Sequence, residues 1–248
     1  MLRLTLCLQW FNFSMSISEN LAAVRERIHK AARRAGRSSE EIALMAVSKT
    51  QPAERIREAY SAGQRLFGEN RVQEFGLKAE VMQDLKDAEW HMIGHLQSNK
   101  AAKTAELFRA VDSVDSVKLA EKLDAAARAL GRTLGVLIEI NVGGETAKSG
   151  VAPDSHRLEE LLLAAPRLKA LVFRGLMTVP PFTDDPQSAR PYFGKLRELR
   201  DAIAARKLPS VAMDELSMGM SHDFEVAIEE GSTCVRVGTA IFGERIKV

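Results

Sequence analysis

The sequence alternates eight times between short apolar stretches and charged segments with helical spacing. The apolar stretches lie near 42–49, 65–68, 89–95, 107–114, 133–142, 171–179, 211–218 and 233–242. The charged segments lie near 52–62, 71–86, 98–106, 117–130, 154–165, 187–206 and 222–230. Short apolar strands that alternate with amphipathic helices are typical of parallel βαβ units. The pattern therefore predicts an α/β fold with a parallel sheet.

Eight such units match a (β/α)8 barrel, which typically needs about 250 residues. The alternative is an open doubly wound sheet, which carries a glycine-rich turn after its first strand. Here the first apolar stretch ends in Ser48-Lys49-Thr50 instead. A further helix, near 18–35, precedes the first strand, with Leu21, Val24, Ile28 and Ala32 on one face. We therefore expect a single-domain (β/α)8 TIM barrel over residues 15–248.

The first 14 residues differ from the rest of the chain. Segment 1–14 is apolar and aromatic, but Gln9 and Asn12 interrupt it and no small-residue cleavage site follows. Met15 stands directly before Ser16, where a helix is expected to begin. We interpret 1–14 as a poorly ordered extension, or as the product of a start codon assigned upstream of Met15.

The composition argues against several function classes. Lys and Arg number 35 against 33 Asp and Glu, so the net charge of +2 indicates neither a nucleic-acid nor a membrane partner. No apolar run is long enough to span a bilayer. The two cysteines, Cys7 and Cys234, form no spaced pair, which fits a reducing compartment. We expect a cytoplasmic protein, and a barrel of this size can exist as a monomer.

Lys49 is the most informative single residue. An isolated lysine is usually a surface residue, but the end of a barrel strand places its amine at the mouth, where barrels carry their chemistry. Near the end of the chain, 216–221 is expected to open a helix and 235–239 to close a strand. Both segments combine glycine with small hydroxyl side chains, which is the chemistry of a phosphate site. An amine beside a phosphate cradle indicates a phosphorylated aldehyde held as a Schiff base.

Other polar residues also collect at the ends of the apolar stretches. In order, these ends are Ser48-Lys49, Gly68-Glu69-Asn70, Gly94 to Gln97, Asp112 to Asp115, Asn141, Met177-Thr178, Ser217 to Ser221 and Gly238-Thr239. Core packing alone does not account for this placement. The strand ends therefore predict a functional site at the C-terminal face of the barrel.

These motifs resemble the pyridoxal 5′-phosphate (PLP) homeostasis protein family, whose fold is like the N-terminal barrel of alanine racemase. The matching stretches are Ala46 to Thr50, Phe67 to Asn70 with Gln73-Glu74, His91 to Lys100, Asn141, Glu145, Lys148 to Gly150, Gly175 to Thr178, Leu216 to Ser221 with Asp223, and Arg236 to Gly243. The resemblance extends over everything from Met15 onward, and the order of the motifs argues against a chance match. Segment 1–14 is the one clear departure.

The resemblance implies a role for each matching residue. Lys49 corresponds to the lysine that forms the Schiff base with PLP. The phosphate cradle corresponds to Ser217, Ser221, Gly238 and Thr239. Ser221 is the stronger of the two serines, because it stands where an N-cap should precede the helix beginning near Asp223. Ser217 could equally be a strand residue satisfied by backbone.

Two further positions carry alternatives. Arg236 alternates with Gly238 along the strand and would face the pyridine nitrogen, although an ordinary salt bridge is the alternative. Asn70 would lie near the cofactor, or it would cap the helix that begins near Arg71. We weigh these two interpretations of Asn70 equally.

Two histidines raise the alternative of a metal site, because alternate strand residues share a face. His91 and His95 have no third ligand at a suitable spacing, so we interpret His91 as a core or pocket residue. Asn141, Glu145 and Lys148 are expected to form a loop network over the pocket, with no evident chemical role.

Two function classes remain: a PLP-dependent racemase or decarboxylase, and a PLP carrier without turnover. Racemisation needs an acid–base group on each face of the cofactor, and Lys49 can serve only one. Alanine racemase takes its second base, a tyrosine, from an additional domain, whereas this sequence ends at Val248. Its two tyrosines, Tyr60 and Tyr192, fall in expected helices away from the mouth. We therefore expect a non-catalytic PLP-binding protein, with PLP-dependent apo-enzymes as candidate recipients.

Overall fold

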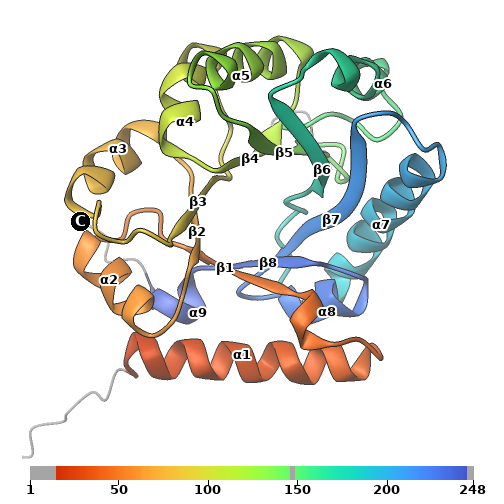
Figure 1. Ribbon diagram of the computed structural model, residues 1–248. Helices are drawn as coiled ribbons and strands as arrows, with labels where there is room; N and C mark the ends of the chain where they lie inside the picture. Colours follow the sequence, from red (N-terminus) through yellow and green to blue (C-terminus); the bar gives the residue numbers. More distant parts are fainter. Residues whose placement is uncertain (1–14, 146–148, 245–248) are drawn as a thin grey trace, which may run out of the picture.

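In the computed structural model the chain forms a closed eight-stranded parallel barrel, which confirms the predicted fold class (Figure 1). The structure describes residues 15–145 and 149–244, so the predictions for 1–14 and Lys148 lie outside the described residues. Neighbouring strands pair in sequence order, and β8 closes against β1. The strands are β1 (Ala43–Val47), β2 (Leu66–Glu69), β3 (Glu89–Met92), β4 (Ala110–Val114), β5 (Leu134–Glu139), β6 (Leu171–Met177), β7 (Val211–Met220) and β8 (Cys234–Val237).

The helices form a ring outside the strands (Figure 1). They are α1 (Ile17–Arg34), α2 (Ala53–Ser61), α3 (Val72–Val81), α4 (Ala101–Leu107), α5 (Val117–Ala129), α6 (His156–Ala164), α7 (Arg190–Ala205), α8 (Phe224–Glu229) and α9 (Thr239–Phe242). Short 3-10 turns lie at Ser39–Glu41, Ser98–Lys100, Ala165–Arg167 and Pro186–Ala189. None of the helices described within 15–145 and 149–244 is both long and apolar enough to span a membrane.

Helix α1 covers the side of the barrel where the last helix, α9, has only four residues. It begins with a capping box, in which Ser16 and Glu19 satisfy each other's backbone N–H groups. Asn20 ties it to α9 by donating to the carbonyl of Ile241 at 2.9 Å. The predicted apolar face is buried, with Leu21 fully buried and Ile28 only 4% exposed. Helix α1 thus supplies the cover that a longer eighth helix would supply.

The C-terminal part of the chain differs from the sequence-based expectation. Strand β7 continues to Met220, so 216–221 does not open a helix, and α8 begins only at Phe224. Gly219 has φ +94°, and a Cβ there would lie 2.6 Å from the Cβ of Ala227. Only glycine therefore fits this bend. The expected strand 233–242 likewise divides into β8 and the short helix α9.

Candidate functional site

A pocket of about 390 Å³ lies at the C-terminal ends of the strands, where the sequence predicts it. It brings together six of the seven predicted site residues. They are Lys49, Asn70, Ser221, Arg236, Gly238 and Thr239. The seventh, Ser217, is not among the residues that line it. Residues from opposite ends of the sequence meet here because β8 pairs with β1.

Lys49 lies two residues beyond the end of β1, and its half-buried side chain lines the pocket. Strand residues alternate between the barrel interior and the helix layer. Val47 lines the same pocket, so Lys49 continues the inward-facing series of β1 into the mouth. The structure therefore places Lys49 at the barrel mouth, among the residues that line the pocket.

Arg236 is a buried cation on the inner face of β8, with 3% of its surface exposed. Its Nη1 donates to the hydroxyl of Ser217 at 2.8 Å, and its Nη2 donates to the carbonyl of Thr178 at 2.7 Å. Burial lowers the pKa of the guanidinium from its ordinary value. Among the described residues no carboxylate lies within ion-pair distance of it, so the salt-bridge alternative is wrong. The pocket thus contains a fixed donor held by neutral partners.

Ser217 occupies a different position from the one expected. It lies within β7, is fully buried, and accepts a hydrogen bond from Arg236. Unlike Arg236, Ser217 is not among the residues that line the pocket. This placement removes Ser217 from the candidate phosphate cradle and makes it a support for Arg236.

Ser221 lines the pocket, but it does not cap α8. The N-cap of α8 is Asp223, whose Oδ1 accepts from the backbone N–H of Met220 at 2.6 Å. The Ser221 hydroxyl instead accepts from the backbone N–H groups of Gly238 and Ala240, at 3.2 and 3.3 Å. Two backbone N–H groups therefore point toward the Ser221 hydroxyl oxygen at the edge of the pocket. The expectation that Ser221 caps α8 was wrong. Strand β7 continues past Ser217 and therefore places Ser221 beside α9.

Asn70 lines the pocket, and its Oδ1 is buried without a hydrogen-bond partner. The N-cap of α3 is Arg71, and no side-chain hydrogen bond caps this helix. The helix-cap alternative is therefore wrong. Gly94 lies directly behind Asn70, because a Cβ at Gly94 would approach the Asn70 carbonyl oxygen to 2.5 Å. A buried unpaired acceptor is costly, so a donor on a ligand would stabilise it.

The two histidines considered as metal ligands do not lie together. His91 is in the lower barrel, where its Nδ1 is 3.1 Å from Asp112. Strand β3 ends at Met92, so His95 no longer follows the alternation, and its Nδ1 lies 3.6 Å from Asp115. Across the part of the chain that the structure describes, no group of three His, Cys, Asp or Glu residues could hold a metal ion.

The loop after β5 carries two of the three residues expected to form a network, Asn141 and Glu145, within the described part of the chain. Asn141 donates to the carbonyl of Glu145 at 2.8 Å, so part of the expected loop network is present. Neither residue lines the pocket.

The sequence did not reveal several residues around the site. Val179, Phe182 and His222 line the outer part of the pocket, and the rings of Phe182 and His222 have centroids 5.7 Å apart. Nothing in the local pattern marked them, because they lie in loops. Glu69 and Lys78 form a buried ion pair behind Lys49. Glu69 was among the polar residues at the strand ends, and Glu74 and Lys78 are spaced to meet on one helix, but neither signal pointed to the pair.

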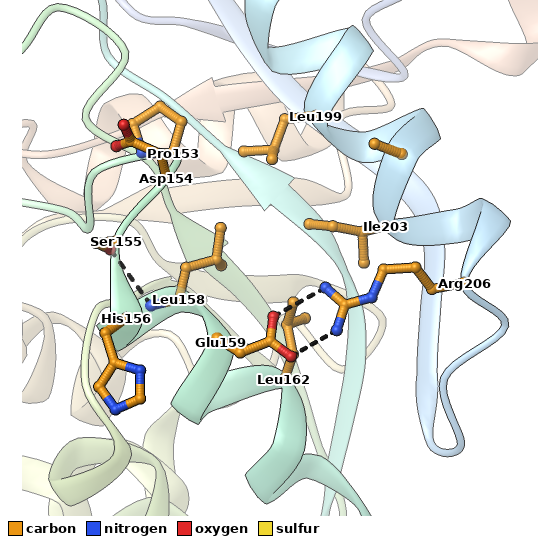
Figure 2. A pocket seen from close by; sticks show the side chains of 11 residues that line it. Pro153, Asp154, Ser155, His156, Leu158, Glu159, Leu162, Leu199, Ile203 and Arg206 are labelled. Carbon is orange, nitrogen blue, oxygen red and sulfur yellow. Dashed lines mark hydrogen bonds and ion pairs between the residues drawn. The ribbon is translucent and has the colours of Figure 1, made fainter.

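A second hollow of about 300 Å³ lies between α6 and α7 (Figure 2). Its floor is apolar, with Leu158, Leu162 and Ile203, and Arg206 donates to both carboxylate oxygens of Glu159 at its edge (Figure 2). None of the predicted site residues lines it, and its lining includes no lysine. The pocket at the barrel mouth is therefore the candidate site.

Comparisons with known proteins agree with this geometry. The family model of the alanine racemase N-terminal domain matches residues 20–246. The pyridoxal phosphate homeostasis protein of Aquifex aeolicus is 50% identical over 232 residues, which are 93% of this chain and 99% of that protein. PipY of Synechococcus elongatus has been solved without and with PLP bound. The two structures are 39% and 38% identical to this chain, with TM-scores of 0.79 and 0.77, and each match covers 92% of this chain and 100% of that one. The chain belongs to the pyridoxal phosphate homeostasis protein family.

Proposed function

We propose that this protein binds pyridoxal 5′-phosphate in the pocket at the barrel mouth, holds it as a Schiff base on Lys49, and serves its intracellular homeostasis without catalytic turnover. The observation that carries the proposal is the convergence of three chemistries on one pocket. These are the Lys49 amine, the Arg236 guanidinium and the backbone N–H groups around Ser221. The structure of a relative with PLP bound supports the choice of ligand.

The residues present fit this cofactor. The cavity of about 390 Å³ falls within the usual range for small-molecule sites. Gly238 and Thr239 lie at the start of α9, where backbone N–H groups favour an anion. The Oδ1 of Asn70 is a buried acceptor that lacks a protein partner. A ligand with an anionic end and polar ring substituents would satisfy these groups.

Each residue then has a defined role. Ser221, Gly238 and Thr239 would hold the phosphate, and Arg236 would donate a hydrogen bond to the ring nitrogen. Lys49 would supply the amine for covalent attachment. Asn70 would accept a hydrogen bond from a ring substituent. Ser217 acts through Arg236, because its hydroxyl accepts from the guanidinium and fixes its orientation.

When bound, PLP supplies an aldehyde that reacts reversibly with amines and a ring that can withdraw electrons if its nitrogen is protonated. A guanidinium beside that nitrogen disfavours protonation, because both groups would then be positively charged. Neither tyrosine lines the pocket: Tyr60 bonds Asp87 outside the barrel, and Tyr192 packs against the helix layer. These features support a carrier. The alternative, a PLP-dependent racemase or related enzyme, is favoured by the match to the alanine racemase domain.

The first experiment tests covalent attachment. Purified protein incubated with PLP is reduced with borohydride, digested and analysed by mass spectrometry. The proposal expects one reduced adduct, on the peptide that contains Lys49. An adduct on another lysine, or no adduct at saturating PLP, contradicts it.

The second experiment separates the carrier from the enzyme. The protein is loaded with PLP and mixed with L- and D-amino acids in deuterated water, with alanine racemase as the positive control. Losing a well-placed acid–base group costs about two to four orders of magnitude in rate. We therefore expect α-proton exchange far below the control. Saturable exchange at the control's rate that disappears in Lys49→Ala would establish the enzyme instead.

The proposal has three further parts: the recipients of the cofactor, the compartment and the oligomeric state. PLP-dependent apo-enzymes are the proposed recipients of the cofactor, the proposed compartment is the cytoplasm, and the proposed state is a monomer. Sedimentation at several protein concentrations, with and without PLP, tests the monomer. A mass that rises with concentration would contradict it.

A further inference from the structure

The two residues that flank Lys49 are hydrogen-bonded to carboxylates, one at the end of strand β2 and one on helix α3. On one side, the Ser48 hydroxyl donates to Oε1 of Glu69 at 2.7 Å. On the other side, the backbone N–H of Thr50 donates to Oε1 of Glu74 at 2.6 Å. The side chain before Lys49 and the backbone after it are therefore each held by a carboxylate.

Lys78 joins these two attachments. Its Nζ lies 2.6 Å from Oε1 of Glu69, 3.2 Å from Oε1 of Glu74 and 3.1 Å from the carbonyl oxygen of Ser48. Nζ donates hydrogen bonds to Glu69 and to the Ser48 carbonyl oxygen, and it forms an ion pair with Glu74. The side chain of Lys78 is 12% exposed and that of Glu69 is fully buried. We call Ser48, Thr50, Glu69, Glu74 and Lys78 the clamp.

Burying the charged groups of the clamp costs folding free energy. Burial raises the pKa of Glu69, and its Oε2 is buried without a hydrogen-bond partner. Buried ion pairs are weak contributors to stability because of their desolvation cost. A small apolar cluster between the sheet and α3 would serve packing alone at least as well. This arrangement favours a role beyond packing.

Thr50 shows that the clamp constrains the backbone. Its φ is +63°, which is a rare conformation for a β-branched residue. Such conformations persist only where the surroundings over-determine them, and they cluster at functional sites. The hydrogen bond from Thr50 to Glu74 supplies that constraint one residue after Lys49.

We propose that Lys78, acting through Glu69 and Glu74, is a positioning residue that fixes the Lys49 backbone so that the amine meets the aldehyde of PLP. The role rests on the proposed function of Lys49. Attachment joins Nζ of Lys49 to the aldehyde carbon and releases one water, so it depends on the placement of one atom. Non-covalent binding through the phosphate and ring does not depend on Lys49. The clamp should therefore affect attachment and leave non-covalent affinity unchanged.

The test compares two ligands in the variant Lys78→Met, which keeps the apolar stem and removes the cation. PLP can form the Schiff base, whereas pyridoxine 5′-phosphate carries an alcohol in place of the aldehyde and cannot. A displacement of about 1 Å can cost about 100-fold in a reaction. We therefore expect the preference for PLP over pyridoxine 5′-phosphate to fall by about 10- to 100-fold, with the affinity for pyridoxine 5′-phosphate unchanged. The absorption band of the Schiff base should weaken in parallel.

One control changes an ion-paired lysine outside the clamp, and three further variants change the clamp itself. Lys103→Met removes an ion-paired lysine on α4, where Lys103 lies 2.8 Å from Glu106 and is half exposed, and should leave the preference unchanged. Lys78→Arg keeps the cation and should restore part of the preference. Glu74→Ala removes the acceptor for Thr50 at a less buried position, so it tests the clamp if Lys78→Met does not fold. Glu74→Gln keeps that acceptor and should resemble the wild type more closely than Glu74→Ala.

The outcomes separate the clamp from the proposed function. A wild-type protein with no reducible adduct on Lys49 overturns the proposed function and this role with it. A normal wild type with an unchanged preference in both Lys78→Met and Glu74→Ala overturns the clamp alone. An equal loss of affinity for both ligands also overturns it, because the cluster would then support the whole pocket.

Discussion

The two ends of the barrel interior treat buried charge in opposite ways. At the lower end, His91 pairs with Asp112 and Arg174 pairs with Glu215. At the upper end, Arg236 is held by a hydroxyl and a carbonyl, with no carboxylate partner among the described residues. The lower end pairs its charged groups directly, whereas the upper end holds a buried cation on neutral hydrogen-bond partners beside a pocket. The contrast places a buried charge without an ion-pair partner at the end of the barrel that carries the candidate site.

Cys234 lies between these two ends. It is buried on the inner face of β8, and burial raises the pKa of its thiol to about 12. A thiol with this pKa stays neutral and unreactive near neutral pH. The buried cysteine is therefore part of the packed interior and separates the paired lower charges from Arg236.

The largest expected effect is at the upper end, in Lys49→Ala. This variant should lose the borohydride-reducible PLP adduct completely, while its thermal midpoint stays within a few degrees of the wild type. The side chain is half-buried at the mouth and lines the pocket, outside the hydrophobic core. Mass spectrometry and thermal unfolding check the two halves of the prediction. A retained adduct at the same pocket would refute the assignment of Lys49.

The next effect is at the lower end, in Asp112→Ala. Removing one partner of a buried pair leaves His91 uncompensated, which typically costs about 3–5 kcal/mol of unfolding free energy. The folded fraction should still bind PLP with wild-type affinity. Urea unfolding and PLP titration measure the two quantities. A loss of PLP affinity without a loss of stability would reverse the proposed division between the two ends.

A smaller effect is expected at the phosphate side of the upper pocket. Charge-assisted hydrogen bonds contribute about 1.5–3 kcal/mol. Ser221→Ala and Thr239→Ala should therefore each weaken PLP binding by about one to two orders of magnitude. The same variants should bind phosphate-free pyridoxal almost normally, as measured by titration. Equal losses for both ligands would mean that these hydroxyls do not contact the phosphate.

The smallest effect is a pH dependence from the lower end. Burial alone would lower the pKa of His91, but the Asp112 carboxylate outweighs it, and the folded-state pKa is raised. The resulting stabilisation is fully present below the unfolded pKa of about 6.5 and is lost as pH rises through the folded pKa. The unfolding free energy should thus fall as pH rises above about 6.5. His91→Gln should flatten this part of the profile in urea titrations, and a wild-type stability that rises over the same range would contradict the pairing.

Much of the site was predictable because it follows from strand periodicity. The alternation of residues along a strand placed Lys49 at the mouth and put Arg236 on the same face as Gly238. The order of eight apolar stretches predicted the barrel, and the barrel predicted which strand ends meet. These inferences need only the local backbone repeat, which the residues of each segment determine.

The side-chain partners were not predictable in this way. Ser217 meets Arg236, Ser221 meets the N–H groups of α9, and Lys78 meets Ser48. Each contact joins segments 17 to 30 residues apart in the sequence. A local pattern contains no information about which of several nearby acceptors a donor will reach.

The sequence by itself determined the order of strands and helices, the barrel and the inward face that carries Lys49 and Arg236, because hydrophobic periodicity is a short-range property. The exceptions are the ends of β7 and β8, where the expected bounds were wrong. Only the tertiary structure decided that Ser217 supports an arginine, that Asn70 keeps an unpaired acceptor, and that α3 clamps the backbone around Lys49. Those outcomes depend on distances between elements, which are set when the closed sheet and its ring of helices pack together.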